Sequence, residues 1–288
     1  MKDVDTIIYH GDCPDGFCAA FVAQKVHPEA RLVPATYGKT LDDAVVSGRR
    51  VLVVDFSWPR EETLRLHALS ESMTILDHHK TAQSALEGLD FAVFDMERSG
   101  AQLAYDYCIR DGRPVEDSGG SRPWYVDYVA DRDLWLWTLP ESKAVSAFIM
   151  ALPHTIAAWN VLDSMNVDEA IASGKGARAH VEHYIEKVTA QAYPGKWQGY
   201  SVSIVNAAYP NISDVGNALC EQGAQVGLGW FIRGDGLMQF SLRSIGDIDV
   251  SALAKQQGGG GHKNAAGFQI SAFSGAALLG AMTSDVGA

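Results

Sequence analysis

Five short apolar runs in the first hundred residues constrain the fold of this chain more than any other feature. They cover residues 6–10, 31–35, 51–56, 73–77 and 91–94, and each is rich in β-branched, aromatic or other apolar residues. Helix-like stretches lie between them. This alternation is typical of a parallel sheet with crossover helices, so the sequence predicts an α/β fold in the first half of the chain.

Polar residues stand at the C-terminal ends of three of these runs. They are His10 and Asp12 after the first run, Asp55 in the third, and Asp77, His78 and His79 at the end of the fourth. Ligands of open parallel sheets bind at this edge. We therefore expect these side chains to converge on one site.

The segment HGDCPDG, residues 10–16, adds a second carboxylate, Asp15, in a tight turn set by Pro14 and Gly16. A further pair, Asp131 and Asp133, stands in the apolar and aromatic segment YVADRDLWLW. Each carboxylate also has an ordinary structural interpretation, as a helix cap or as an exposed residue of an amphipathic helix.

Taken together, three histidines and several aspartates at one sheet edge suit a pair of divalent cations with nitrogen and oxygen ligands. Carboxylates can bridge two such ions, and the ions would polarise a phosphoryl group and generate a hydroxide nucleophile. The sequence contains no Walker loop and no nucleophile elbow that would favour another chemistry.

The second half of the chain has a different pattern. We expect a loop at 113–123, helices at 125–137, 143–165 and 170–187, a break at 193–195, β-strands at 200–206, 229–233 and 237–243, and a last helix at 276–282. These limits predict a catalytic metal-binding domain at 1–170, a linker helix at 171–195 and a smaller α/β substrate-binding domain at 196–288.

One motif of the second domain has the composition of an anion site. The segment QQGGGGHKNAAGF contains Gly259, Gly260, Gly261 and His262, and Arg243 precedes it in FSLRS. Consecutive glycines let backbone N–H groups approach a phosphate, a helix start would add donors, and Arg243 offers a bidentate fork. A flexible linker is the alternative interpretation of the glycines.

Charge and composition limit the partners. The net charge of −12 argues against a protein that binds long duplex DNA, because such affinity comes from many Lys and Arg contacts. The four cysteines form no CxxC pair and are expected to be buried thiols in a reducing compartment. No apolar run is long enough to span a membrane and no signal peptide is recognisable, so we expect a cytoplasmic protein. The oligomeric state stays open, a homodimer included.

In sequence order, HGDCPDG, VVDFS, LDHH, VADRD, SLRS and GGGGHKNAAG resemble the motifs of the DHH phosphoesterase superfamily with its DHH-associated C-terminal domain. The resemblance extends from Tyr9 to Phe268. This superfamily includes RecJ-type exonucleases, nanoRNases, linear and cyclic dinucleotide phosphodiesterases and manganese-dependent pyrophosphatases. The resemblance implies a parallel-sheet DHH domain with flanking helices, a linker helix and a smaller α/β domain, with the active site in the cleft between the two domains.

The resemblance also implies roles for single residues. His10 and Asp12 would hold one metal ion, Asp15, His78 and Asp131 the other, and Asp55 would bridge both. His79 would contact the substrate phosphate, and the second domain would hold the rest of the substrate through Arg243, His262 and Gly259 to Gly261. The spacing of His10, Asp12 and Asp15 departs from the commoner family patterns by one extra residue between the carboxylates, which leaves the role of Asp12 open.

The predicted function is that of a phosphodiesterase that hydrolyses short oligonucleotides or dinucleotides with two divalent cations, manganese first, with magnesium and cobalt as alternatives. A phosphatase of small phosphoanhydrides or mononucleotides, as in the pyrophosphatase branch, is the second hypothesis. An exonuclease of longer single strands and a non-catalytic binding protein are the others. RNA, DNA and cyclic or linear dinucleotides stay open as substrates.

Overall fold

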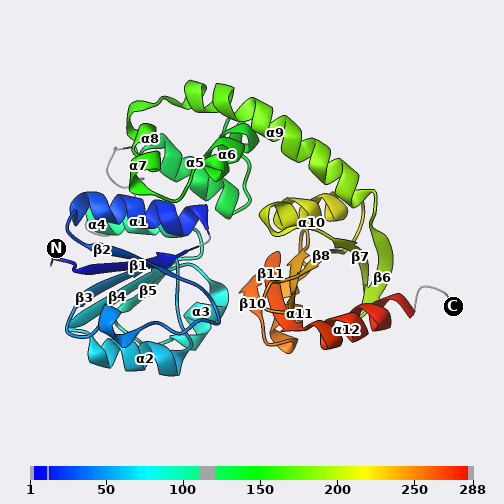
Figure 1. Ribbon diagram of the computed structural model, residues 1–288, viewed down its shortest axis with the longest axis horizontal. Coiled ribbons are helices and arrows are strands. Elements are labelled where there is room, and N and C mark those ends of the chain that lie inside the picture. Colours follow the sequence, from blue (N-terminus) through cyan, green and yellow to red (C-terminus); the bar gives the residue numbers. More distant parts are fainter. Residues whose placement is uncertain (1–2, 12, 111–120, 285–288) are drawn as a thin grey trace. The chain divides into compact units, whose positions relative to one another are not determined.

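A five-stranded parallel sheet forms the centre of the first unit of the protein (Figure 1). The computed structural model describes residues 3–11, 13–110 and 121–284, and it divides into the units Met1–Arg178 and Ala179–Ala288. The strands of the first unit are β1 (Thr6–His10), β2 (Arg31–Ala35), β3 (Arg50–Val54), β4 (Ser72–Asp77) and β5 (Ala92–Phe94). Their order is β2-β1-β3-β4-β5 and all pairs are parallel, so the predicted α/β fold is confirmed.

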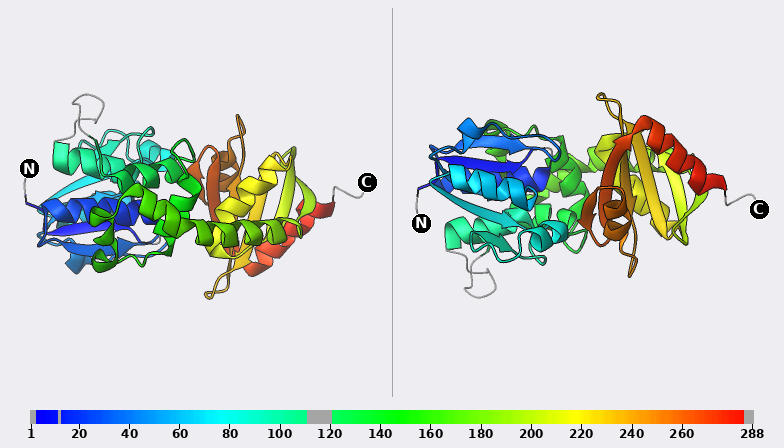
Figure 2. Two further views of the ribbon diagram at one scale, coloured as in Figure 1. Left: turned by 90° about the horizontal axis from the view of Figure 1, so that it is seen from above. Right: turned by 90° about the horizontal axis from the view of Figure 1, so that it is seen from below.

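Helices cover both faces of this sheet (Figures 1 and 2). They are α1 (Pro14–Val26), α2 (Arg60–Leu69), α3 (Lys80–Ala85) and α4 (Gly100–Arg110), with a short 3-10 helix, η1 (Asp43–Val45). Ile7 and Tyr9 belong to the apolar cluster that contains α1 and α4, whereas Ile8 packs in the other cluster with Leu66 of α2. Because successive strand residues point to opposite faces, both faces need apolar residues, which explains the continuous apolar runs.

A helical layer follows on the chain: α5 (Trp124–Asp133), α6 (Ser142–Ala151), α7 (Ile156–Trp159), α8 (Val161–Ser164) and α9 (Val167–Thr189). The helix predicted at 125–137 ends earlier, at Asp133, because Trp135 and Trp137 adopt left-handed backbone conformations with φ of 58° and 55°. The helix predicted at 143–165 is three short helices, and Pro153, which cannot donate a helical hydrogen bond, follows the first of them.

The predicted linker helix ends at Thr189 and does not reach residue 195. A strand, β6 (Tyr193–Trp197), occupies the place of the expected break and pairs with β7 (Tyr200–Asn206). The two residues between them, Gln198 and Gly199, have φ of 51° and 86°, as a tight hairpin turn requires. Pro194 is tolerated because β6 is an edge strand.

The second unit is built on a six-stranded sheet of order β10-β11-β9-β8-β7-β6. Its other strands are β8 (Val226–Ile232), β9 (Leu237–Arg243), β10 (Gly260–His262) and β11 (Ala265–Ser271), and β7 and β8 are its parallel pair. The helical elements are η3 (Tyr209–Asn211), α10 (Ile212–Glu221), α11 (Val250–Gln256) and α12 (Ala272–Ser284).

The two faces of this second sheet are covered by different helices. On one face, α10 approaches β8 so closely that a Cβ on Gly227 would lie 2.0 Å from the carbonyl oxygen of Gly216. On the other face, α11 and α12 pack on the apolar cluster that contains Phe240 and Phe268. Within the described residues, no helix combines the length and apolar character needed to cross a membrane.

A buried ion-pair cluster fixes α4 in the first unit. The carboxylate of Asp106, which is 1% exposed, accepts hydrogen bonds from Nη1 of Arg98 at 2.8 Å and from Nη2 and Nε of Arg122 at 2.7 and 3.2 Å. Arg122 is itself 9% exposed. Loss of the Asp106 carboxylate would be costly, because it compensates guanidinium charge that is shielded from water.

We therefore expect Asp106→Ala to reduce the free energy of unfolding by about 3 kcal/mol, since it leaves the buried guanidinium of Arg122 with the longer ion pair to Asp127, at 3.5 Å, in place of its two hydrogen bonds to Asp106. Urea unfolding of the two proteins measures the difference. Asp95→Ala, which removes a more exposed partner of Arg98, is the control and should cost at most about 1 kcal/mol. Equal effects of the two substitutions would contradict the structural role given to Asp106.

Candidate metal centre

The C-terminal ends of β1, β3 and β4 lie side by side, and each leads into a residue of the predicted site. His10 ends β1, Asp55 follows β3, and Asp77 ends β4 directly before His78 and His79. The chain order reverses between β1 and β3, because β2 pairs with one edge of β1 and β3 with the other. Such a switch point opens a crevice at the strand ends, where α/β proteins bind their ligands.

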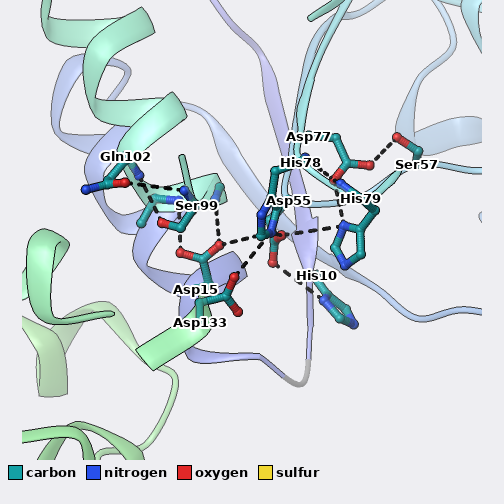
Figure 3. A network of polar contacts seen from close by, with 12 residues as sticks. His10, Asp15, Asp55, Ser57, Asp77, His78, His79, Ser99, Gln102 and Asp133 are labelled. Carbon is teal, nitrogen blue, oxygen red and sulfur yellow. Dashed lines mark hydrogen bonds and ion pairs between the residues drawn. The ribbon is translucent and has the colours of Figure 1, made fainter. Parts of the chain in front are cut away.

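Asp55 is the centre of the site (Figure 3). Its Oδ1 lies 3.1 Å from Nε2 of His78, and its Oδ2 lies 3.5 Å from Nδ1 of His10. The residue is 1% exposed, and its backbone is left-handed with φ of 55°. Asp tolerates this conformation better than most residues, and the strain is of a kind that clusters at functional sites.

Asp15 reaches the same point from the first turn of α1. Its two carboxylate oxygens accept hydrogen bonds from the backbone N–H groups of Gly100, at 2.6 Å, and Ala101, at 3.0 Å. These groups begin α4, whose N-terminus favours negative charge. Oδ2 of Asp15 also lies 3.8 Å from Nε2 of His78. A Cβ on Gly100 would lie 2.5 Å from Cβ of Asp55, so only glycine permits this approach.

The fourth carboxylate at this point is that of Asp133, in the place where Asp131 was expected and Asp133 was the open alternative. Oδ2 of Asp133 lies 3.3 Å from Nε2 of His78. Oδ1 of Asp131 instead accepts hydrogen bonds from the backbone N–H and the hydroxyl of Thr138, at 2.9 and 2.8 Å. Residues two apart on a helix lie on nearly opposite sides, so α5 can present only one of the two to the site.

Asp77 orients the pair of histidines. Its Oδ1 accepts from the backbone N–H of His78 at 2.7 Å and lies 2.7 Å from Nδ1 of His79, and Ser57 donates its hydroxyl to Oδ2 at 2.6 Å. A carboxylate at Nδ1 fixes the tautomer and orientation of an imidazole. The contact of His79 with any ligand would therefore be made through Nε2.

The close approach of several carboxylates determines the pKa values in the site. Burial raises the pKa of Asp15 and of Asp133, and nearby carboxylates raise both further. Burial alone would lower the pKa of His78, but the negative charges of Asp133, Asp55 and Asp15 outweigh it and raise this pKa to about 10. Burial would raise the pKa of Asp55, yet the nearby imidazoles of His10 and His78 lower it. A bound cation would relieve this crowding.

Two of the groups of side chains that could hold a cation contain the proposed ligands of this site. One contains His10, Cys13 and Asp55, and the other contains Asp15, His78 and Asp133, and within each group the ligand atoms lie within 4.8 Å of one another. Asp55 touches residues of both groups, as a bridging ligand would. Asp12 lies outside the described residues. The donors are imidazole, carboxylate and thiol, which suits divalent transition metals.

Aromatic side chains border the centre. The ring of Tyr37, which is 43% exposed, lies 5.3 Å from the ring of His10 and 4.5 Å from that of Phe56. Directly after Asp133, Trp135 and Trp137 lie 5.1 Å apart, and the guanidinium of Arg132 lies 5.2 and 5.4 Å from their rings. These distances are those of edge-to-face and cation–π contacts.

In the second unit, the structure gives Arg243 and the glycine motif local partners. Arg243 ends β9 and donates to the carbonyl of Leu242 at 2.8 Å and to the hydroxyl of Ser213. The expected helix start at the glycines is absent from the described residues, because α11 ends at Gln256, just before them. A helix C-terminus does not attract anions, so this part of the phosphate-cradle hypothesis is corrected.

The glycines are required by close packing of strands. Gly260 and Gly261 form β10 with His262 and pair with β11. A Cβ on Gly259 would lie 2.1 Å from the carbonyl oxygen of Gly267, and Gly261 has φ of 138°. Their contact with a substrate phosphate stays a prediction, as does that of His262.

The sequence pattern placed Asp77 at this edge without its role, left Asp133 open beside Asp131, and did not indicate Cys13. Asp133 was separable from Asp131 only by the direction in which α5 presents it, which no sequence pattern indicates. The role of Asp77 could have been recognised, because Asp-x-His spacing lets a strand-end carboxylate reach the second imidazole. Cys13 stands in the turn between His10 and Asp15, where the sequence predicts only a buried thiol.

Comparison with known proteins finds a match to a domain family and a shared fold. Residues 211–284 match the DHHA1 domain. An uncharacterized protein of Acanthamoeba polyphaga mimivirus is 28% identical over 311 residues, which cover 94% of this chain and 69% of that protein. This relative's function is not described by its name.

Solved structures share the fold along nearly the whole chain. A DHH domain of a member of a ribosomal-protein family has a TM-score of 0.60 at 16% identity, covering 98% of this chain and 86% of its own. The pGpG-specific phosphodiesterase PggH of Vibrio cholerae has 0.52 at 13%, covering 96% and 97%. RecJ of Thermus thermophilus in complex with Mn²⁺ has 0.54 at 14%, covering 96% of this chain and 51% of RecJ.

Metal binding can test the direction in which α5 presents Asp131 and Asp133. We expect Asp133→Asn to weaken Mn²⁺ binding about tenfold or more, because it removes a charged ligand, whereas Asp131→Asn should leave the affinity unchanged. Calorimetric titration of the metal-free proteins measures both. The two substitutions are chemically identical and two residues apart, so a larger loss of affinity in Asp131→Asn would reverse the assignment.

Proposed function

We propose that this chain is a two-metal phosphodiesterase of the DHH type that hydrolyses dinucleotides or short oligonucleotides, because residues 211–284 match the DHHA1 domain and the fold is shared with a DHH domain, PggH and RecJ. The observation that carries this proposal is the grouping of carboxylates, two of them fully buried, around His78. Three of them, from Asp15, Asp55 and Asp133, lie within 3.1 to 3.8 Å of its Nε2. So much buried negative charge is tolerated only beside strong positive charge.

The proposed ligands follow the two groups of side chains. His10 and Asp55 would hold one cation, with Asp12 as a further ligand, and Asp15, His78 and Asp133 would hold the other. Manganese is the proposed cation, and the RecJ structure with the same fold was solved with Mn²⁺. When bound, such a pair polarises a phosphoryl group and lowers the pKa of a water molecule.

His79 is the residue proposed to contact the substrate phosphate. Burial alone would lower its pKa, but the charge of Asp77 and the hydrogen bond to it raise the pKa and favour the protonated ring. With Nδ1 directed at Asp77, the ring would donate its Nε2–H to a phosphate oxygen. Asp77 thereby acts as a positioning residue, since it sets the orientation of His79 without touching substrate.

The aromatic border favours a nucleotide over a small phosphoanhydride. Nucleobases stack on exposed aromatic rings, and such stacking is tolerant of sequence. Tyr37 places such an exposed ring beside that of His10, and Trp135 and Trp137 follow Asp133 in the chain. A phosphoanhydride has no base that would use them. PggH, which shares the fold, is a phosphodiesterase of the dinucleotide pGpG.

The second unit is proposed to bind the rest of the substrate. Its candidates are Arg243 and His262, together with Gly259 to Gly261. Arg243 donates hydrogen bonds to the backbone carbonyl of Leu242 and to the hydroxyls of Ser241 and Ser213. A guanidinium can bind a phosphate through two parallel hydrogen bonds.

The mechanism predicts that Asp55→Asn lowers hydrolysis of a dinucleotide by at least about a thousandfold while the protein stays folded, because the proposed bridging charge is lost. Exposed Asp90→Asn is the matched control and should retain activity. The assay uses a linear dinucleotide, a cyclic dinucleotide and pyrophosphate with Mn²⁺. Activity that survives in Asp55→Asn or in excess chelator would refute the two-metal mechanism, and preference for pyrophosphate would favour the phosphatase hypothesis.

The net charge of the protein predicts which length of substrate is hydrolysed fastest. With a net charge of −12, added phosphates beyond the site meet repulsion, which strengthens as salt and its screening fall. We expect faster hydrolysis of a dinucleotide or trinucleotide than of a strand of about 20 nucleotides at equal concentration, with a gap that widens at low ionic strength. Rates measured across a salt series test this. Equal or faster degradation of the long strand would favour a RecJ-like exonuclease.

A further inference from the structure

A thiol stands among the proposed metal ligands. Sγ of Cys13 and ligand atoms of His10 and Asp55 all lie within 4.8 Å of one another. Cys13 precedes α1 as its N-terminal cap, yet its side chain makes no capping hydrogen bond. Its backbone carbonyl accepts the first helical hydrogen bond, from the N–H of Phe17 at 3.0 Å, whatever side chain stands there.

Two buried polar atoms of the same group lack hydrogen-bond partners within the described residues. They are Oδ2 of Asp55 and Nδ1 of His10, which lie 3.5 Å apart. Asp55 is 1% exposed, so water does not compensate this oxygen from bulk solvent. Buried polar atoms without partners are costly, and a cation between the three side chains would satisfy both atoms.

The remaining cysteines have no such neighbours. Cys18 and Cys108 are 0% and 5% exposed and belong to the apolar cluster around α1 and α4, and Cys220 is 7% exposed. Among the described residues, Cys13 is the cysteine that belongs to a group of potential metal ligands. The expectation of ordinary buried thiols therefore fits the other cysteines better than it fits Cys13.

We propose that the Cys13 thiolate binds the cation held by His10 and Asp55, and that this position prefers Zn²⁺ to Mn²⁺. The proposal rests on the metal centre of the proposed function. On binding, the thiol gives up its proton to solvent and a sulfur–metal bond forms. Soft thiolate ligands favour zinc over manganese, whereas the second group, Asp15, His78 and Asp133, has only oxygen and nitrogen donors. The centre would then hold two different metals.

Cobalt tests the sulfur bond directly, because Co²⁺ replaces Zn²⁺ and thiolate-bound Co²⁺ absorbs in the near ultraviolet. The full chain is stripped with a chelator and titrated with Co²⁺. We expect a thiolate-to-cobalt band in the wild type, its loss in Cys13→Ser, and its retention in the core variant Cys18→Ala. No band in the wild type at saturating Co²⁺, or a band that persists in Cys13→Ser, would overturn the proposal.

Affinity provides a second measure. We expect Cys13→Ser to weaken Zn²⁺ binding about tenfold or more, and Cys13→Asp to reverse the preference toward Mn²⁺ by replacing a soft donor with a hard one. Unchanged Zn²⁺ affinity in folded Cys13→Ser would contradict the assignment.

A third measurement needs no variant and covers the case in which these substitutions prevent folding. Alkylation of Cys13 in the wild type, located by mass spectrometry, should slow about tenfold or more when Zn²⁺ is added. Equal rates with and without Zn²⁺ would refute the proposal.

These readouts separate the two inferences. A cobalt–thiolate band in a protein that hydrolyses no phosphodiester would uphold the Cys13 ligand and refute the proposed function. Phosphodiesterase activity with Mn²⁺ in a protein whose Cys13 is equally reactive with and without Zn²⁺ would do the reverse.

Discussion

The burial of several carboxylates at one edge of a parallel sheet is the constraint on which the rest of the first unit depends. Asp15, Asp55 and Asp77 are each at most 1% exposed, and all lie near the C-terminal ends of β1, β3 and β4. A fold that only needed stability would not place them together, because buried like charges repel one another and lose their hydration. The arrangement is therefore best understood as a site preserved for positive charge.

Much of the surrounding structure serves to tolerate this burial. The N-terminus of α4 donates two backbone hydrogen bonds to Asp15, and Gly100 lets that helix approach Asp55. Asp77 is satisfied by Ser57 and the histidine segment. The buried pair of Asp106 with Arg122 holds α4 at its other turns. Local charge compensation and helix packing are thus parts of one arrangement.

Glycine has a different structural role in each of the two units. In the first unit, a glycine opens space for a carboxylate pair. In the second unit, glycines let backbones touch, as where α10 meets β8 and where β10 meets β11. Strand packing in the second unit therefore explains the glycine run. A contact between these glycines and a phosphate would be a second role for the same backbone.

Apolar periodicity and the common edge of parallel strands are local and topological properties, so the parallel sheet, its strand positions and the convergence of His10, Asp55 and His78 were predictable from the sequence. Whether Asp133 or Asp131 faces the site depends on how α5 is rotated against its neighbours, and a sequence pattern does not set that rotation. The same holds for Cys13, whose chemistry is set by the side chains around it. The strand β6 escaped prediction because its Pro194 and Gly195 signal a turn locally, and pairing with β7 overrides that signal.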